Sequence, residues 1–286
     1  MARKTEFENV IRYKLYRKVS DIIHPSISKK NISDYKIVFE DSLLPVRVFY
    51  PNKISKLSGI IIYIPGDGNL TKCTYEYATI CSDLAKELDK LILAVDYFEH
   101  PNNYPSILDK VEQIVKYLYK ELETVGIEKQ DIILMGDSSG GNFVSSITFR
   151  FIKEKIDYIN KEILLYPLLS GDYDENSKFK SIGNGWICNK ELVNKIQNFM
   201  SEYTKLKKNR KRKDICPLLN KDYSHYPTTL VITGDLDPLR DEGVAFYKKL
   251  NNTSMYQNIK DASHGFLNTK DLKIRHEYLS AIKKFI

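Results

Sequence analysis

Apolar residues from position 59 onward fall into two kinds of segment that alternate along the chain. Short runs rich in Ile, Leu and Val have the composition of buried strands, and longer segments between them repeat apolar residues at helical spacing. The expected strands are GIIIYIPG (59–66), LILAVDY (91–97), DIILMGD (131–137), EILLYPLL (162–169), TTLVITGD (228–235) and SMYQNIKDA (254–262). Because such runs are apolar on both faces, the pattern predicts a mostly parallel sheet covered by helices on both sides.

The amphipathic segments between these runs predict the covering helices. They are residues 74–88, 105–123, 140–155, 239–250 and 271–286. Ahead of the sheet pattern, YKIVFE (35–40) and LPVRVFY (44–50) are joined by a polar turn at Asp41 and Ser42, which predicts an antiparallel hairpin. The start of the chain, about 7–22, has the spacing of a basic amphipathic helix. We expect it to pack on the rest of the protein, with a membrane surface as the alternative.

An insertion of about residues 171–224 separates the two blocks of alternating strands and helices. It contains one expected helix, NKELVNKIQNFMSEYTK (189–205), within irregular, polar chain. An insertion between sheet strands emerges at one end of the sheet, and ligands bind at the C-terminal strand ends. The insertion is therefore expected to form a lid over a pocket.

Charge along the chain is concentrated in one stretch. The net charge is +7, and much of the excess lies in KLKKNRKRK (205–213). We interpret this stretch as a solvated surface loop, with binding to phosphate backbones or anionic lipid as the weaker alternative. The chain contains no apolar stretch of 18 residues, which predicts that no helix crosses a membrane.

The N-terminus carries charge without a following apolar region, so no signal peptide is expected and the predicted location is cytoplasmic. The four cysteines (Cys73, Cys81, Cys188 and Cys216) lack close metal-type spacing, and we expect them to be free thiols in a reducing compartment.

The strand 131–137 ends in a cluster of small residues with a clear catalytic interpretation. Gly136 to Gly140 read G-x-S-x-G, and a helix is expected directly after them. In a strand–turn–helix context this motif presents the central serine, Ser138, as a nucleophile on a sharp and strained turn. Side chains at Gly136 or Gly140 would collide where strand and helix cross closely. No Lys follows the glycines as in a phosphate-binding loop, so the nucleophile interpretation is favoured.

A serine nucleophile needs a base, and histidine has a suitable pKa. On a sheet of this kind the acid and then the histidine follow the serine in the chain. His264 lies in a loop directly after the last expected strand, whereas His276 falls within a helical stretch and is expected on the surface. The acid belongs on the loop after TTLVITG, where Asp235 and Asp237 both fit. Pro238 is expected in the first turn of the next helix, which makes Asp237 either an N-cap or the acid.

Taken together, these motifs resemble the hormone-sensitive-lipase-like family of α/β-hydrolase esterases over most of the chain. GDSSGG (136–141) resembles that family's GDSAGG elbow, SHGF (263–266) its catalytic-histidine segment, and VDYFEHPNNYP (95–105) a shortened form of its DYRLAPEHPFP stretch. DPLRDEG (237–243) is similar to a signature whose first Asp is the triad acid, which selects Asp237. The resemblance implies one α/β-hydrolase domain over 1–286, with a cap built from about 1–33 and about 171–224.

The chain departs from this family where the oxyanion-binding HGGG motif is expected. The corresponding stretch is YIPGDGN, in which Pro65 replaces the histidine. The expected donors to an oxyanion are the backbone N–H groups of Gly66, Asp67 and Ser139. Because only the backbone is required, Asp67 serves if its side chain turns away, and we expect lower activity or an unusual substrate.

The predicted function is therefore a serine carboxylesterase acting on short- to medium-chain acyl esters through an acyl-enzyme on Ser138, with His264 and Asp237. No metal or organic cofactor is expected. The expected partner is a small-molecule ester. We expect no binding to nucleic acid and no stable insertion into a membrane, and we regard a homodimer as possible. The alternatives are a non-catalytic small-molecule receptor on the same fold, or an amidase or peptidase with the same triad.

Overall fold

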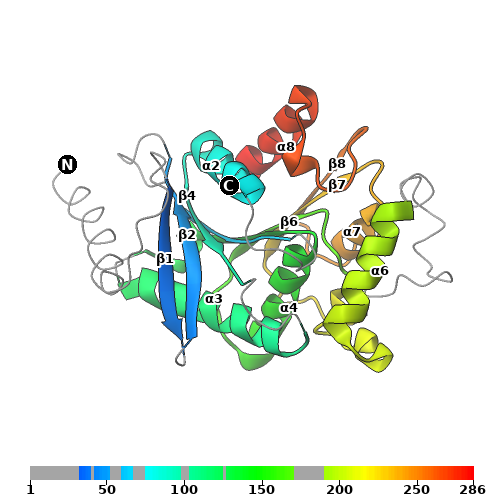
Figure 1. Ribbon diagram of the computed structural model, residues 1–286, viewed down its shortest axis with the longest axis horizontal. Coiled ribbons are helices and arrows are strands. Elements are labelled where there is room, and N and C mark those ends of the chain that lie inside the picture. The colour runs from blue at the N-terminus through cyan, green and yellow to red at the C-terminus, as the bar shows by residue number, and fades with distance from the viewer. Residues whose placement is uncertain are drawn as a thin grey trace.

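The computed structural model describes residues 32–39, 42–51, 59–66, 75–97, 103–124, 127–170 and 190–286. Within these residues, eight strands form one sheet in the order β1-β2-β4-β3-β5-β6-β7-β8 (Figure 1). The strands are β1 (Ile32–Phe39), β2 (Ser42–Phe49), β3 (Ile60–Ile64), β4 (Leu91–Val95), β5 (Ile132–Asp137), β6 (Lys161–Leu165), β7 (Thr228–Gly234) and β8 (Met255–Ile259). All of these strands were expected from the apolar pattern. The expected helix at 7–22 and the start of the insertion, 171–189, lie outside the described residues.

The sheet is parallel except at one end, as predicted. β1 and β2 form an antiparallel hairpin, and β2 pairs antiparallel with β4. Every other pairing is parallel, and its register brings the C-terminal ends of the strands to one edge. Ile64 pairs with Gly136, and Leu165 pairs with both Asp137 and Ile232. Residues that follow β3, β5, β6 and β7 therefore meet at this edge of the sheet.

Helices cover both faces of the sheet (Figure 1). The pair α2 (Tyr75–Leu88) and α8 (Leu272–Phe285) packs on one face. The helices α3 (Ser106–Thr124), α4 (Ser139–Glu154) and α7 (Arg240–Tyr247) pack on the other. The prediction of an α/β-hydrolase architecture is confirmed. α7 begins at Arg240, so the expectation that Pro238 lies in its first turn is wrong; Pro238 lies in a turn before the helix.

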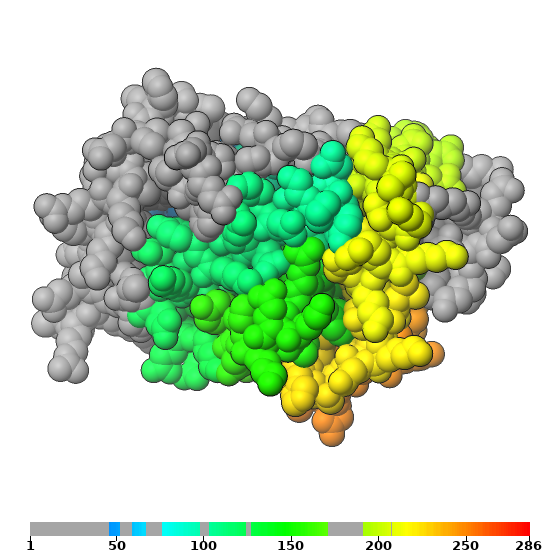
Figure 2. All heavy atoms as spheres, turned by 90° about the horizontal axis from the view of Figure 1, so that it is seen from below, coloured from blue at the N-terminus to red at the C-terminus, as the bar shows by residue number. Residues whose placement is uncertain are grey.

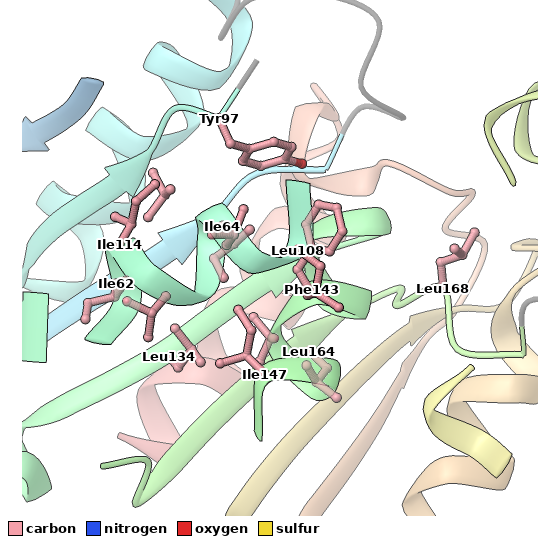
Figure 3. Close-up of a cluster of buried hydrophobic side chains, with 14 of the residues drawn as sticks. Ile62, Ile64, Tyr97, Leu108, Ile114, Leu134, Phe143, Ile147, Leu164 and Leu168 are labelled. Atoms are coloured by element: carbon pink, nitrogen blue, oxygen red, sulfur yellow. The ribbon is translucent and has the colours of Figure 1, made fainter. Parts of the chain in front are cut away.

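Because neighbouring residues of a strand point to opposite faces, the buried strands supply two separate cores. Ile62 and Ile64 contribute to the core beneath α3 and α4, whereas Ile61 contributes to the core beneath α2 and α8. Figure 3 shows the first of these cores, in which the rings of Tyr97 and Phe143 pack edge to face with centroids 5.3 Å apart. α4 is thereby held against the sheet next to its N-terminus.

The described part of the insertion packs beside α3 and α4. It consists of α6 (Lys190–Thr204) and two short 3-10 helices, η3 (Lys207–Lys211) and η4 (Pro217–Leu219). Figure 2 shows this yellow part of the chain next to the green surface of α3 and α4. Tyr203 at the end of α6 packs on Phe143, with ring centroids 5.7 Å apart, and its carbonyl accepts from the N–H of Tyr104 at 2.7 Å.

Two further sequence expectations concern charge and thiols. Most of the described side chains in the basic stretch 205–213 are exposed. Cys81 and Cys216 are buried and form no disulfide bond, whereas Cys73 and Cys188 lie outside the described residues. None of the helices in the described part of the chain is long and apolar enough to cross a membrane.

Candidate active site

Ser138 lies on a strained turn between β5 and α4. Its backbone angles are φ 50° and ψ −119°, a conformation that costs a non-glycine residue roughly 1–3 kcal/mol. The turn is tight because a Cβ on Gly136 would lie 2.6 Å from the backbone of Gly140, and one on Gly140 would lie 2.0 Å from the carbonyl oxygen of Ile64. The steric reason predicted for these two glycines is confirmed. The turn projects the side chain of Ser138 beyond the edge of the sheet.

A chain of hydrogen bonds joins three segments that are far apart in the sequence. The Oγ of Ser138 lies 2.9 Å from the Nε2 of His264, and the Nδ1 of His264 lies 2.9 Å from the Oδ2 of Asp237. These residues follow β5, β8 and β7, whose C-terminal ends share one edge of the sheet. The structure thus brings the three predicted triad residues together in the order hydroxyl, imidazole, carboxylate.

The loop after β7 distinguishes the two candidate acids. Asp237 is fully buried, and its second oxygen, Oδ1, accepts from the N–H of Leu239 at 2.8 Å. Asp235 instead bonds with the guanidinium of Arg240, 3.3 Å away, and its side chain is 37% exposed. Asp237 therefore holds the turn ahead of α7 with one oxygen and His264 with the other, while the carboxylate of Asp235 bonds Arg240 and Asn258.

The electrostatic environment of His264 favours its protonated form. Burial alone would lower the pKa of this imidazole, but the charge and hydrogen bond of Asp237, together with the charges of Asp137 and Glu242, raise it above its ordinary value. The ring of Tyr166 packs edge to face on the imidazole, with centroids 4.9 Å apart. The imidazole is thus oriented on one side by a carboxylate and on another by an aromatic ring.

Asp137, immediately before the nucleophile, is a buried carboxylate that the sequence analysis did not identify. It accepts hydrogen bonds from the hydroxyl of Tyr63 at 2.6 Å, the hydroxyl of Tyr77 at 3.0 Å and the N–H of Gly66 at 2.8 Å. Burial raises its pKa, and these three donors oppose the rise. A tyrosine inside a run of isoleucines and an aspartate ending a buried strand are polar exceptions in apolar runs, and this signal points to a polar cluster.

The bond from Gly66 corrects one prediction. A backbone N–H has one proton, and that of Gly66 is already donated to Asp137, so Gly66 is not placed to stabilise an oxyanion. The absence of a side chain is still required there, since a Cβ would lie 2.6 Å from the carbonyl oxygen of Asp137. Asp67 lies outside the described residues. Ser139 is buried and is the first residue of α4, where the N–H groups of the first turn have no intrahelical acceptor.

The other two histidines that the structure describes lie outside this cluster. His225 and His276 are exposed, the latter on α8 as expected, and His24 and His100 lie outside the described residues. Among the residues that the structure describes, no group of three or more His, Cys, Asp or Glu side chains could hold a metal ion.

Known proteins that are similar to this chain agree with the geometry of the site. A family described as alpha/beta hydrolase fold matches residues 61–268. Ethyl acetate hydrolase of Pseudomonas putida is 25% identical, over 77% of this chain and 69% of its own length. Arylacetamide deacetylase of Rattus norvegicus is 24% identical, over 91% of this chain and 82% of its own.

Among solved structures, carboxyl esterase 2 from Tuber melanosporum superposes with a TM-score of 0.76 and 22% identity. The superposition covers 90% of this chain and 88% of that one. This likeness shows the fold, and the resemblance to α/β-hydrolase esterases inferred from the motifs is confirmed.

Proposed function

Since the chain belongs to this family of the alpha/beta hydrolase fold, we propose that it is a serine carboxylesterase acting through an acyl-enzyme on Ser138. The observation that carries the proposal is the unbroken sequence of hydrogen bonds from Ser138 through His264 to Asp237. Serine, histidine and aspartate in this geometry activate a hydroxyl for attack on an acyl carbon.

The proposed reaction uses the two nitrogens of His264 for different tasks. The Nε2 accepts the proton of Ser138 as its Oγ attacks the ester carbonyl, and then returns that proton to the leaving alcohol. The Nδ1 keeps its proton and donates it in a hydrogen bond to Asp237, whose carboxylate stabilises the imidazolium formed during attack. Water, with its proton accepted by the same Nε2, then attacks the acyl carbon and releases the acid and the free Ser138 hydroxyl.

The negative charge that develops on the carbonyl oxygen needs backbone donors. We assign one donor to the N–H of Ser139, because it opens the 16-residue helix α4 directly beside the nucleophile. The N–H of Asp67, next in sequence after Gly66, stays the predicted second donor. Each such donor lowers the barrier by about 3–4 kcal/mol.

Short- to medium-chain acyl esters are the proposed substrates, with the cap built from about 1–33 and 171–224 limiting the pocket. The relative named ethyl acetate hydrolase supports a small ester. The relative named arylacetamide deacetylase favours amide hydrolysis as a second candidate. Matched p-nitrophenyl acetate and p-nitroacetanilide separate these two, because an amidase turns over both compounds whereas an esterase turns over only the first.

Substitution of the nucleophile tests the mechanism. Ser138→Ala should lower kcat on p-nitrophenyl acetate by at least about 10⁴-fold with an unchanged melting temperature. The matched control is Ser145→Ala within α4, whose hydroxyl donates to the carbonyl of Gly141 at 3.1 Å rather than to Ser138, His264 or Asp237. A fluorophosphonate should label the wild type at Ser138 and leave the Ser138→Ala variant unlabelled. Retained hydrolysis in that variant, or a folded wild type without adduct, contradicts the proposal.

A further inference from the structure

The insertion leaves and rejoins the hydrolase core through two segments that meet at α4. We define the first stem as residues 165–170, which begins at the last residue of β6, and the second stem as residues 215–219, ahead of β7. The side chain of Asn142 in α4 is buried and contacts both. Its Nδ2 donates to the carbonyl of Leu168 at 2.7 Å and to the carbonyl of Ile215 at 2.8 Å. An amide nitrogen carries two protons, so one side chain joins the two stems.

Asn142 also belongs to a closed ring of hydrogen bonds with the nucleophile. The carbonyl of Ser138 accepts from the N–H of Asn142 at 3.2 Å and from the N–H of Leu168 at 3.0 Å. Since the carbonyl of Leu168 accepts from the side chain of Asn142, the three residues hold one another in place. This ring fixes the carbonyl of Ser138, the residue with the strained backbone. A strained conformation of this kind persists only where several surrounding contacts hold it in place.

Two further contacts make the stems a single unit. The N–H of Leu218 donates to the carbonyl of Leu169 at 3.3 Å, which links the stems directly. The carboxylate of Glu242 in α7 accepts from the N–H groups of Leu169 and Ser170, each at 2.9 Å. The first stem is therefore held from α4 on one side and from α7 on the other.

We propose that Asn142 is a positioning residue that couples both stems of the insertion to the turn that carries Ser138. It does not touch the reacting atoms. It acts through Leu168 on the backbone of Ser138, and through Ile215 on the return of the insertion to the core. Among side chains of this size, only asparagine can donate two hydrogen bonds from a single planar nitrogen. Aspartate presents only acceptors at neutral pH, and serine has one proton to donate.

Amide hydrogen exchange tests the coupling without reference to activity. In Asn142→Ala, peptides that cover residues 165–170 and 215–219 should exchange at least about ten-fold faster, while the peptide of α8 (272–285) keeps its wild-type rate. The matched control is Asn209→Ala in η3, which removes one amide-to-carbonyl bond, to Thr204 at 2.8 Å, and no bond to either stem or to α4. It should leave both stem peptides unchanged.

The kinetic part of the test rests on the proposed function. With rates normalised to the serine titrated by a fluorophosphonate, Asn142→Ala should lower kcat on p-nitrophenyl acetate about ten-fold relative to Asn209→Ala. The pH at which the acid limb of kcat/KM falls should not move, because the bonds of His264 are untouched. A variant that merely contained less folded protein would keep its kcat per titrated site.

The outcomes separate the two proposals. Unchanged exchange in either stem peptide overturns the coupling, and so does an increase that extends equally to α8. If the wild type lacks esterase activity but both stem peptides still exchange faster in Asn142→Ala, the proposed function is overturned and the coupling is supported. Asn142→Ser, which retains one donor, takes the place of the alanine variant if the latter does not fold.

Discussion

Replacement of Glu162 by glutamine should stabilise the protein in alkaline but not in acidic buffer. Glu162 lies in β6 with no exposed surface, and the hydroxyls of Tyr226, Thr148 and Thr229 face it, the last two at 2.9 Å and 3.2 Å. Each threonine hydroxyl also lies 2.9 Å from a backbone carbonyl, of Val144 and Pro227 respectively. One threonine hydroxyl can therefore give its proton to its backbone carbonyl and accept a bond from the neutral side chain, while the other donates to the remaining oxygen, so that either a protonated carboxyl or an amide is satisfied at this position.

The expected magnitude follows from the pKa of Glu162. Burial raises this pKa from 4.5 to about 7, and the surrounding hydroxyls only partly oppose the rise. The folded protein therefore binds this proton more tightly than the unfolded chain does. The resulting stabilisation is complete below pH 4.5 and is lost as the pH rises through about 7. Between pH 5 and pH 8.5 the wild type should lose about 2 to 3 kcal/mol of unfolding free energy from this group alone.

Urea unfolding followed by circular dichroism at pH 5 and pH 8.5 measures the effect. Glu162→Gln should match the wild type within about 1 kcal/mol at pH 5 and exceed it by about 2 to 3 kcal/mol at pH 8.5. Other titrating groups, His264 among them, contribute equally to both proteins and cancel in the comparison. The matched control is Glu202→Gln on the exposed side of α6, whose difference from the wild type should stay within about 0.5 kcal/mol at both pH values.

Two results would refute the reasoning about Glu162. A difference between variant and wild type that does not change with pH would mean that the carboxyl titrates as it does in the unfolded chain. A variant that is less stable at pH 8.5 would mean that the ionised form makes contacts that the amide cannot replace. Either result would remove the inference that this side chain is neutral in the folded protein below about pH 7.

Asp237→Asn should lower kcat on p-nitrophenyl acetate by about 10⁴-fold. It should also move the acid limb of kcat/KM to lower pH, because the effect of burial, which lowers the pKa of His264, is then less opposed; an acid limb that moves upward would contradict the assignment. Gly140→Ala should cost at least about 3 kcal/mol of stability, since its Cβ would lie 2.0 Å from the carbonyl oxygen of Ile64. Gly265→Ala should cost only about 1 kcal/mol, because φ is +77° but no atom lies within 4 Å of the new Cβ, and thermal melts of the two variants check the contrast.

The sheet and its helices could be predicted because their signals are local. Near-continuous apolar runs identify strands buried on both faces, and the order of the runs with amphipathic segments between them leaves little choice of topology. The triad followed from the same reasoning, because residues after parallel strands meet at one edge. The choice between Asp235 and Asp237 needed the resemblance, since both lie on the same loop and only the direction of the turn separates them.

The residues that escaped prediction have partners that no local pattern reveals. Asn142 and Glu242 bond to backbone atoms of the insertion's stems, 26 and 73 residues away from Asn142 and 72 and 73 residues away from Glu242. Gly66 was misassigned for the same reason. Its motif position suggested an oxyanion donor, but whether its N–H reaches the substrate or Asp137 depends on the path of the chain after β3. Backbone acceptors carry no sequence signature, so these contacts become visible only in three dimensions.

The nucleophile's conformation is a tertiary property of this chain. The two glycines permit the turn at Ser138, but they do not impose it, since a glycine relaxes the backbone on either side of the strained residue. The turn is imposed by bonds to Ser138 from elsewhere: its N–H donates to the carbonyl of Leu165 at 2.9 Å, and its carbonyl accepts from Leu168 at 3.0 Å. Both partners lie in the segment that leads into the insertion. Substitutions in that segment should therefore alter the reactivity of Ser138 through its backbone, and this is the physical basis of the coupling proposed between the stems of the insertion and the turn that carries the nucleophile.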